Sequence, residues 1–206
     1  MNPADTPQRV YIIDDDVDVR DSLKWLLNSV HLDVVCFDNA QDFLEQCPSD
    51  AEGCIIMDLR MPGLSGINAQ KNLAKYHIDL PLIMISAHGS IDTAVTALQQ
   101  GALTFLEKPF DDQVLIDHVQ MALTQDKAHK ASVHEKQALK ARYNTLTKRE
   151  KEVFQHVVRG LSNQETADAL GVNRKTVEGH RANMIAKMAS PSLADLVQAA
   201  VALELL

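Results

Sequence analysis

Four short segments of this sequence carry side chains suited to phosphoryl chemistry. Asp14 to Asp16 follow one apolar run, and Asp58, Ser86 and Lys108 each stand at the end of a later run or just after it. Adjacent carboxylates repel one another unless a cation lies near them. Two or three carboxylates around one point suit a hard divalent ion such as Mg²⁺, while a lysine and a small hydroxyl suit phosphoryl oxygens. The residue types therefore favour magnesium-assisted phosphoryl transfer, provided that the fold brings them together.

The apolar runs themselves predict a fold that would do this. Short runs rich in Val and Ile alternate with segments of helical periodicity. The runs are 9–13, 33–37, 53–58, 80–86 and 102–107, and the helical segments are 17–30, 39–46, 66–76, 90–100 and 111 onward. This alternation predicts an α/β fold with a doubly wound, five-stranded parallel sheet. Because ligands in such sheets bind at the carboxyl ends of the strands, the polar segments should meet at one edge.

The distribution of charge indicates two domains with different partners. The net charge of −8 is unevenly distributed along the chain. Residues 1–123 hold 7 Lys and Arg against 19 Asp and Glu, a net charge of −12. Residues 124–143 hold 5 basic against 2 acidic residues (+3), and residues 144–206 hold 8 basic against 7 acidic residues (+1). No apolar run approaches the roughly 20 residues of a membrane span, and the amino terminus has no signal-peptide pattern. We therefore expect a cytoplasmic protein without membrane contacts, whose three cysteines are reduced thiols.

The sequence changes character after residue 123. Residues 124–143 lack Gly and Pro, are rich in Ala and Lys, and predict a solvated helical linker that continues the fifth helix, with a flexible tether as the alternative. Residues 144–206 then predict four helices with recognisable caps, of which the middle two form a helix-turn-helix. The expected caps are Thr147, Ser162, Asn173 and Ser192, and the first three helices should end near Arg159, Gly171 and Met188.

Residues 8–123 resemble the receiver domains of two-component response regulators, which have a flavodoxin-like fold, so residues 1–123 are assigned to such a domain. The similarity rests on IIDDD, MDLRMPGLSGI, ISAHGS and FLEKPF in this order, with 28 residues from Asp58 to Ser86 and 22 more to Lys108. The resemblance implies that Asp58 accepts the phosphoryl group and that Lys108 and Ser86 contact it. It further implies that Phe105 changes rotamer with Ser86 as part of a switch. The implied magnesium ligands are Asp14, Asp15, Asp58 and the backbone carbonyl of Arg60.

Other residues near the predicted site have simpler interpretations. Asp16 and Asp18 fit the first turn of the following helix, where negative charge suits the helix dipole. Many relatives carry Thr in place of Ser86, so the hydroxyl is kept but the amplitude of the switch is open. His88 is interpreted as a loop histidine, and the peptide before Pro109 is a candidate for the cis form.

Residues 144–206 resemble the DNA-binding domain of LuxR/NarL-type regulators, and the whole chain looks most like the FixJ subgroup. The similar text is LTKREKEVFQHVVRGLSNQETADALGVNRKTVEGHRANMIAKM. The resemblance implies that the helix 174–188 enters the major groove. The candidates for backbone contact are Lys175, Thr176 and His180, those facing base edges are Glu178, Gly179 and Ala182, and Asn163 would lie near phosphate. Glu150 is expected to pair inside the domain, with Arg181 or Lys187.

Two residues depart from the pattern of this family. Gly179 stands where relatives often have a β-branched residue, which costs about 1 kcal/mol of helix propensity and removes a possible thymine-methyl contact. Thr166 stands where isoleucine is common, so the first helix of the motif is expected to pack less tightly.

Together these features predict a phosphorylation-switched transcription regulator rather than an enzyme with a separate substrate. The expected partners are a sensor histidine kinase, double-stranded promoter DNA and RNA polymerase, with homodimerisation through roughly 87–122 on phosphorylation. Two alternatives remain open. An aspartyl-phosphate-forming phosphatase would use Asp14 as nucleophile, and a regulator of another kind would bind DNA without phosphorylation.

Overall fold

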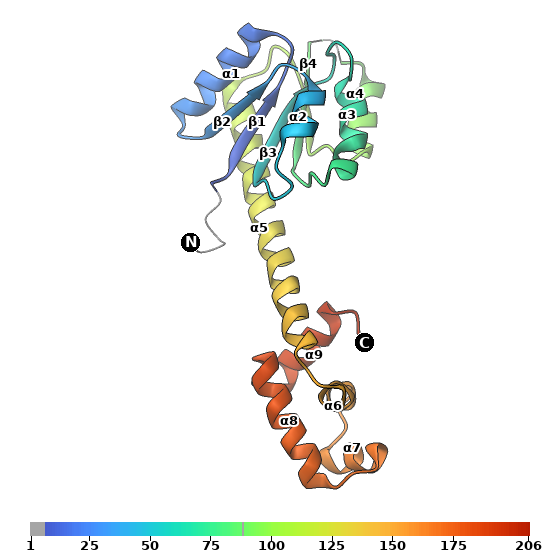
Figure 1. Cartoon of the computed structure of the whole chain (residues 1–206). Coiled ribbons are helices and arrows are strands. Elements are labelled where there is room, and N and C mark those ends of the chain that lie inside the picture. Colours follow the sequence, from blue (N-terminus) through green and yellow to red (C-terminus); the bar gives the residue numbers. More distant parts are fainter. Residues whose placement is uncertain (1–6, 88) are drawn as a thin grey trace. The chain divides into compact units, whose positions relative to one another are not determined.

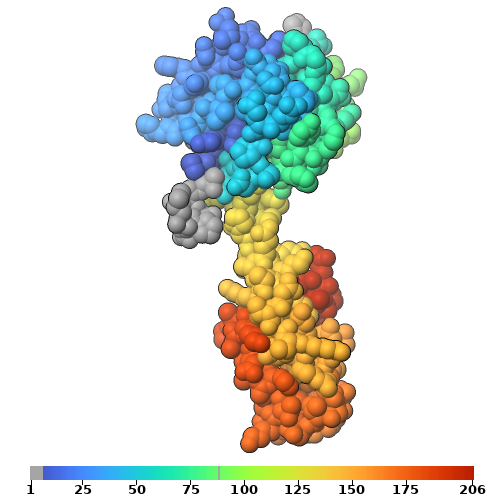
Figure 2. Space-filling view, in the orientation of Figure 1, coloured from blue at the N-terminus to red at the C-terminus, as the bar shows by residue number. Residues whose placement is uncertain are grey.

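The computed structural model of the chain describes residues 7–87 and 89–206 (Figures 1 and 2). His88 therefore lies outside the described residues. The chain divides into two compact units, Met1–Lys130 and Ala131–Leu206, and each is described by itself. Over the two described ranges, no helix is both long and apolar enough to cross a membrane.

The first unit alternates strands and helices along the chain (Figure 1). Its strands are β1 (Arg9–Ile13), β2 (Asp33–Phe37), β3 (Gly53–Asp58), β4 (Leu82–Ser86) and β5 (Thr104–Glu107). Its helices are α1 (Val17–Ser29), α2 (Ala40–Gln46), α3 (Gly66–Asn72), the 3-10 helix η1 (Leu73–Tyr76), α4 (Ile91–Gln99) and the first part of α5 (Asp112–Asn144). The strands pair in parallel in the order β2-β1-β3-β4-β5. The predicted five-stranded parallel sheet is thus confirmed.

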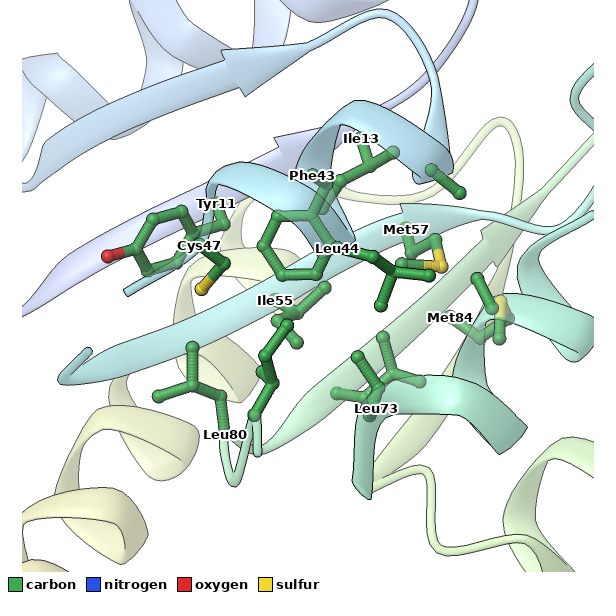
Figure 3. Packing of buried hydrophobic residues seen from close by; sticks show 14 of the residues in the cluster. Tyr11, Ile13, Phe43, Leu44, Cys47, Ile55, Met57, Leu73, Leu80 and Met84 are labelled. Carbon is green, nitrogen blue, oxygen red and sulfur yellow. The ribbon is translucent and has the colours of Figure 1, made fainter. Parts of the chain in front are cut away.

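Helices cover both faces of this sheet because successive side chains of a strand point to opposite faces. Tyr11 and Ile13 of β1 belong to one buried cluster with residues of α2, α3 and α4, whereas Val10 and Ile12 belong to another with α1 and α5. Figure 3 shows the first cluster, in which the rings of Tyr11 and Phe43 lie 5.8 Å apart between centroids. The sheet is therefore doubly wound, as its sequence pattern predicts.

The helix α5 extends from the first unit into the second, and each part is packed. Asp126 is buried, and its Oδ2 accepts a hydrogen bond of 2.8 Å from the backbone N–H of Gly53 at the start of β3. At the other end, Leu139 and Tyr143 pack against the core of the second unit. The segment 124–143 is helical, as expected, but it is not solvated throughout, because its first turns are fastened to the sheet.

The second unit is all-helical, with α6 (Lys148–Val158), α7 (Asn163–Leu170), α8 (Arg174–Met188) and α9 (Leu193–Ala202). Each helix follows the capping residue that the sequence predicts, and the side chain of each cap accepts a backbone hydrogen bond from the first turn. Buried residues of all four helices, among them Phe154, Ala167, Met184 and Leu196, share one core. This core holds α7 and α8 together as a helix-turn-helix.

Candidate functional site

The polar residues predicted to meet do lie at one edge of the sheet. Asp14 directly follows β1, Asp58 ends β3, Ser86 ends β4, and Lys108 directly follows β5. Because all strands are parallel, their carboxyl ends face the same way. The strand order also reverses between β1 and β3, which is where ligands bind in open sheets of this kind.

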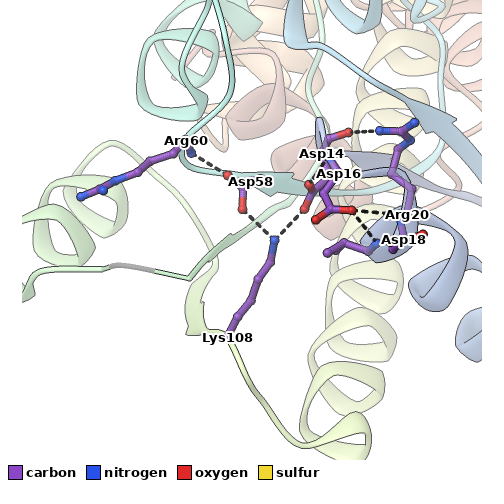
Figure 4. A network of polar contacts seen from close by, with 8 residues as sticks. Asp14, Asp16, Asp18, Arg20, Asp58, Arg60 and Lys108 are labelled. Atoms are coloured by element: carbon purple, nitrogen blue, oxygen red, sulfur yellow. Dashed lines mark hydrogen bonds and ion pairs between the residues drawn. The ribbon is translucent and has the colours of Figure 1, made fainter.

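A lysine bridges the two buried carboxylates at this edge (Figure 4). Nζ of Lys108 lies 2.7 Å from Oδ2 of Asp14 and 2.8 Å from Oδ1 of Asp58. Asp14 and Asp58 are only 1% and 6% exposed, so both ion pairs are largely shielded from water. The peptide between Lys108 and Pro109 is cis, as the sequence suggested. A single ammonium thus holds two carboxylates from strands that are neighbours in the sheet.

Backbone groups fix the remaining oxygens of the pair. Oδ1 of Asp14 accepts a hydrogen bond of 3.0 Å from the N–H of Asp16, and Oδ2 of Asp58 accepts one of 2.6 Å from the N–H of Arg60. Nη1 of Arg20 on α1 donates to the backbone carbonyl of Asp14 at 2.6 Å. The sequence pattern did not identify Arg20, since nothing in the helical period of α1 distinguishes this contact from an exposed arginine.

Burial and ion pairing shift the pKa values of this site in opposite directions. Burial raises the pKa of Asp14 above its ordinary value, although the hydrogen bond from Lys108 opposes the effect. Burial lowers the pKa of Lys108, but its hydrogen bonds to Asp14 and Asp58 outweigh this and raise the pKa overall. Lys108 is therefore firmly protonated at neutral pH and offsets only one of the negative charges around it.

An open cavity of about 310 Å³ lies beside these residues. Its lining includes Asp14, Asp15, Asp58, Arg60, Ser86 and Lys108. Within the described chain, no three His, Cys, Asp or Glu side chains are gathered closely enough to form a metal cluster by themselves. Magnesium does not require such a cluster, because it commonly keeps several waters and binds through one or two carboxylates. The oxygen-rich, net negative lining therefore fits that ion.

The two residues assigned to the switch lie on neighbouring strands. Ser86 is 1% exposed at the end of β4, and Phe105 on β5 is half-buried. In the parallel ladder Phe105 is paired with Met84, two residues before Ser86, so the side chains of Ser86 and Phe105 point to the same face of the sheet. We call the carboxyl end of the sheet, with Asp14, Asp58, Ser86 and Lys108, the acidic edge. A change at this edge can reach β5 through the neighbouring strand β4.

Asp16 and Asp18 take the simpler roles that the sequence suggested. Asp16 is the N-cap of α1, and its Oδ1 accepts hydrogen bonds from the N–H groups of Asp18 and Val19 at 2.9 and 3.4 Å. Asp18 lies in the first turn of the helix. Both carboxylates therefore stabilise the start of α1.

The helix-turn-helix presents most of the predicted DNA contacts at its surface. Lys175, Thr176, Glu178, Gly179 and Ala182 on α8 are exposed, and His180 and Asn163 are half-buried. A Cβ at Gly179 would meet nothing within 4 Å, so the glycine leaves open space on the outer face of the helix. In the structure Arg174 pairs with Glu178 at 2.8 Å, and Thr176 bonds to its cap Asn173 at 2.8 Å.

Inside this unit Glu150 pairs with Lys187, which was one of its two expected partners. Nζ of Lys187 lies 2.7 Å from Oε2 of Glu150, which also accepts the capping hydrogen bond from the N–H of Thr147 at 2.7 Å. The other candidate, Arg181, instead donates to Asn163 on α7 at 2.8 Å. Thr166 is completely buried, and in the described part of the chain its hydroxyl oxygen has no hydrogen-bond partner, so its burial carries a desolvation cost that an apolar residue would not have. The looser packing expected from the sequence stays a prediction.

Comparisons with known proteins agree on both units. Residues 10–120 match the family described as response regulator receiver domain, and residues 144–200 match the bacterial regulatory proteins of the luxR family. The chain is 41% identical to the transcriptional regulatory protein TdiR of Thauera aromatica over 91% of this chain and 83% of that protein. It is 40% identical to the transcriptional regulatory protein FixJ of Rhizobium meliloti (strain 1021) over 96% of this chain and 97% of that protein.

Solved structures give the same result. The response regulator StyR has a TM-score of 0.87 with 37% identity, covering 95% of this chain and 99% of that one. Full-length FixJ from B. japonicum has a TM-score of 0.59 with 38% identity, covering 98% of this chain and 100% of that one. Since both family matches and these near full-length relatives agree with the folds of the two units described above, the chain belongs to the FixJ-like two-component response regulators, transcription factors that join a receiver domain to a LuxR-type DNA-binding domain.

Proposed function

We propose that Asp58 accepts a phosphoryl group from a histidine on a partner sensor kinase. An Asp58 oxygen attacks phosphorus, the bond from phosphorus to the histidine nitrogen breaks, and that nitrogen takes a proton from solvent. The observation that carries this proposal is the position of Lys108, whose ammonium lies 2.8 Å from Oδ1 of Asp58 in a shielded setting. A cation so placed offsets the negative charge on the transferred group, and the hydroxyl of Ser86 at the same edge is a suitable second contact.

Asp14, Asp15, Asp58 and the backbone carbonyl of Arg60 would hold Mg²⁺ at this edge. The bound ion would supply charge neutralisation for the phosphoryl oxygens. The support for this assignment is the chemistry of the lining, in which the four carboxylates of Asp14, Asp15, Asp16 and Asp58 outnumber the two cationic side chains of Arg60 and Lys108. The hydrogen bonds from Arg20, Asp16 and Arg60 hold the loops that carry these ligands.

Phosphorylation would then act on dimerisation. The negative charge added to Asp58 favours a second conformation in which Ser86 and Phe105 have moved, and the ligand-free and phosphorylated proteins differ only in the populations of the two. The surface over roughly 87–122 is the proposed dimer contact, and it carries the exposed apolar side chains of Ile91, Val95 and Leu98 on α4. Residues 1–123 would act as receiver, 124–143 as linker and 144–206 as the DNA-binding domain.

The dimer would place α8 of each chain in the major groove of paired half-sites in promoter DNA. We assign Lys175, Thr176, His180 and Asn163 to the DNA backbone, and Glu178, Gly179 and Ala182 to the edges of bases. The assignment is supported by the open space at Gly179 and by the exposure of Lys175, Thr176, Glu178, Gly179 and Ala182. RNA polymerase is the partner that a promoter-bound regulator would meet, in the cytoplasm.

The test compares dimer formation and promoter binding with and without a phosphodonor, for the wild type and for Asp58→Asn. The proposal predicts that the phosphodonor increases both for the wild type only. Promoter binding that is unchanged by the phosphodonor would favour a phosphorylation-independent regulator. The phosphatase alternative is tested by labelling with acetyl phosphate, because label that is lost in Asp14→Asn but kept in Asp58→Asn would make Asp14 the nucleophile.

A further inference from the structure

One hydrogen bond joins the two helices of the helix-turn-helix near their outer surface. Nη1 of Arg181 on α8 donates to Oδ1 of Asn163, the first residue of α7, at 2.8 Å. Both side chains are half-buried, so the bond is partly shielded from competing water. It ties the start of α7 to the middle of α8.

The chemistry of the two groups fixes which way the amide of Asn163 is turned. A guanidinium carries only hydrogen-bond donors, so the atom that it faces must be the acceptor oxygen Oδ1. The amide nitrogen of Asn163, with its two N–H donors, then occupies the other branch of the side chain. Amide N–H groups of this kind donate to phosphate oxygens and set the register of a protein on DNA.

Arg181 itself is not on the outer face of α8. It follows the buried Val177 by one helical turn and precedes the buried Met184 by three residues, so it stands at the border of the core. The outer face at this level carries the exposed residues Glu178 and Ala182. The guanidinium is therefore directed within the domain, where it reaches α7.

We propose that Arg181 is a positioning residue for DNA binding: its bond to Oδ1 of Asn163 turns the amide N–H donors of that side chain toward a DNA phosphate. The inference rests on the DNA-binding function proposed above. Arg181 then raises affinity without touching DNA. Asn163 makes a phosphate contact that releases no counterion, because its side chain is neutral.

A double-mutant cycle on the full-length chain tests this, with a duplex of random sequence as the probe. Arg181→Met and Asn163→Ala should each weaken binding by about fivefold, the loss expected for one hydrogen bond. The double variant should bind the duplex as tightly as the single variant of lower affinity, since both changes remove the same contact. Thermal unfolding of each variant checks that the fold is kept.

The salt dependence of DNA binding shows whether Arg181 acts through Asn163 or contacts a phosphate itself. Lys175→Met, which removes a proposed cation–phosphate contact, should reduce the slope of log K against log salt by about 0.9. Arg181→Met should leave that slope unchanged. A slope reduced by about 0.9 for Arg181→Met, or losses that multiply in the double variant, would overturn the inference. A wild type without salt-dependent binding would instead contradict the proposed DNA-binding function itself.

A measurement on the wild type avoids any effect of substitution on folding. Adding the duplex should shift the NMR signals of the Asn163 side-chain amide and leave those of the Arg181 guanidinium in place. Shifts at Arg181 without shifts at Asn163 would overturn the proposal.

Discussion

The backbone of Gly89 passes against the ring of Phe105. A Cβ at position 89 would stand 2.6 Å from both Cε1 and Cζ of that ring, closer than any ordinary contact allows. The absence of a side chain at Gly89 therefore gives the ring the room that it occupies. Since Phe105 is a proposed part of the switch, this loop glycine controls the space that one position of the switch needs.

Gly89→Ala should uncouple dimerisation from phosphorylation. The added methyl group displaces the ring of Phe105 and should therefore disturb the exchange between two ring positions that we propose for the wild type. The phosphodonor-dependent change in dimer fraction, measured by analytical ultracentrifugation, should shrink. The rate at which Asp58 is phosphorylated should stay within roughly twofold, because the acidic edge is untouched.

The control for this prediction is Phe105→Leu, alone and with Gly89→Ala. Leucine lacks the ring atoms that the new methyl group would meet. Adding Gly89→Ala to Phe105→Leu should therefore change the dimer response little. An equally large further change in the double variant would show that Gly89 acts through other neighbours.

Lys108→Met should slow phosphorylation by acetyl phosphate on the order of 10²-fold, the usual loss when one preorganised donor is removed from developing negative charge. The ammonium that contacts both Asp14 and Asp58 is absent from this variant. Intact-mass time courses measure the rate. Lys75→Met, which removes an exposed lysine of the same unit, should leave the rate unchanged. Equal rates for wild type and Lys108→Met would rule out the role given to this lysine.

Glu150→Gln should destabilise the second unit in a pH-dependent way. The hydrogen bond from Lys187, followed by that from the N–H of Thr147, holds the pKa of Glu150 below its ordinary value of 4.5. Such a carboxylate stabilises the fold above pH 4.5, and its contribution is lost as the pH falls through the lowered pKa. At neutral pH we expect a loss of about 2 kcal/mol in the free energy of unfolding, read from hydrogen exchange of α6 amides in the full chain. The difference should shrink as the pH falls below 4.5.

Glu165→Gln is the matched control for that variant. Glu165 closes the same kind of capping box at the start of α7, but it is exposed and has no buried pair with a lysine within the described residues. Its replacement should therefore cost clearly less than that of Glu150. Equal losses would mean that the cap rather than the Lys187 pair dominates.

Lys175→Met should weaken binding to all DNA sequences to a similar degree and reduce the salt slope by about 0.9. The reason is that Lys175 is exposed on α8 and is proposed to neutralise one phosphate. Lys151→Met removes a lysine of the same unit whose Nζ lies 5.0 Å from the ring of Tyr143, and it should leave the slope unchanged. A base-specific loss without a change in slope would contradict the assignment of Lys175.

The strands were predictable because a strand that is buried on both faces of a sheet is encoded by a short continuous run of apolar residues. β1, β2 and β3 begin and end where their apolar runs do. β4 begins at Leu82 rather than Leu80, since Pro81 has no N–H for the ladder. The meeting of Asp14, Asp58 and Lys108 also followed from the sequence, because parallel strands bring their carboxyl ends to one edge.

Contacts between side chains of different elements were not predictable in this way. Glu150 had two possible partners at suitable positions, and only the packing of α6 against α8 selects Lys187. The sequence predicts that Asp126 is a solvated residue of a charged helix, yet its carboxylate accepts a hydrogen bond from the N–H of Gly53. Such pairs depend on rotamers and on the direction of neighbouring helices, and residue periodicity carries neither.

The most direct test of the account is the site of phosphorylation. Full-length protein is incubated with Mg²⁺ and acetyl phosphate, and its mass and its peptides are then measured for wild type and Asp58→Asn. The account predicts that the wild type gains one phosphoryl group, that the modified peptide carries it on Asp58, and that Asp58→Asn gains none. No gain in mass, or a phosphoryl group on Asp14, would contradict it.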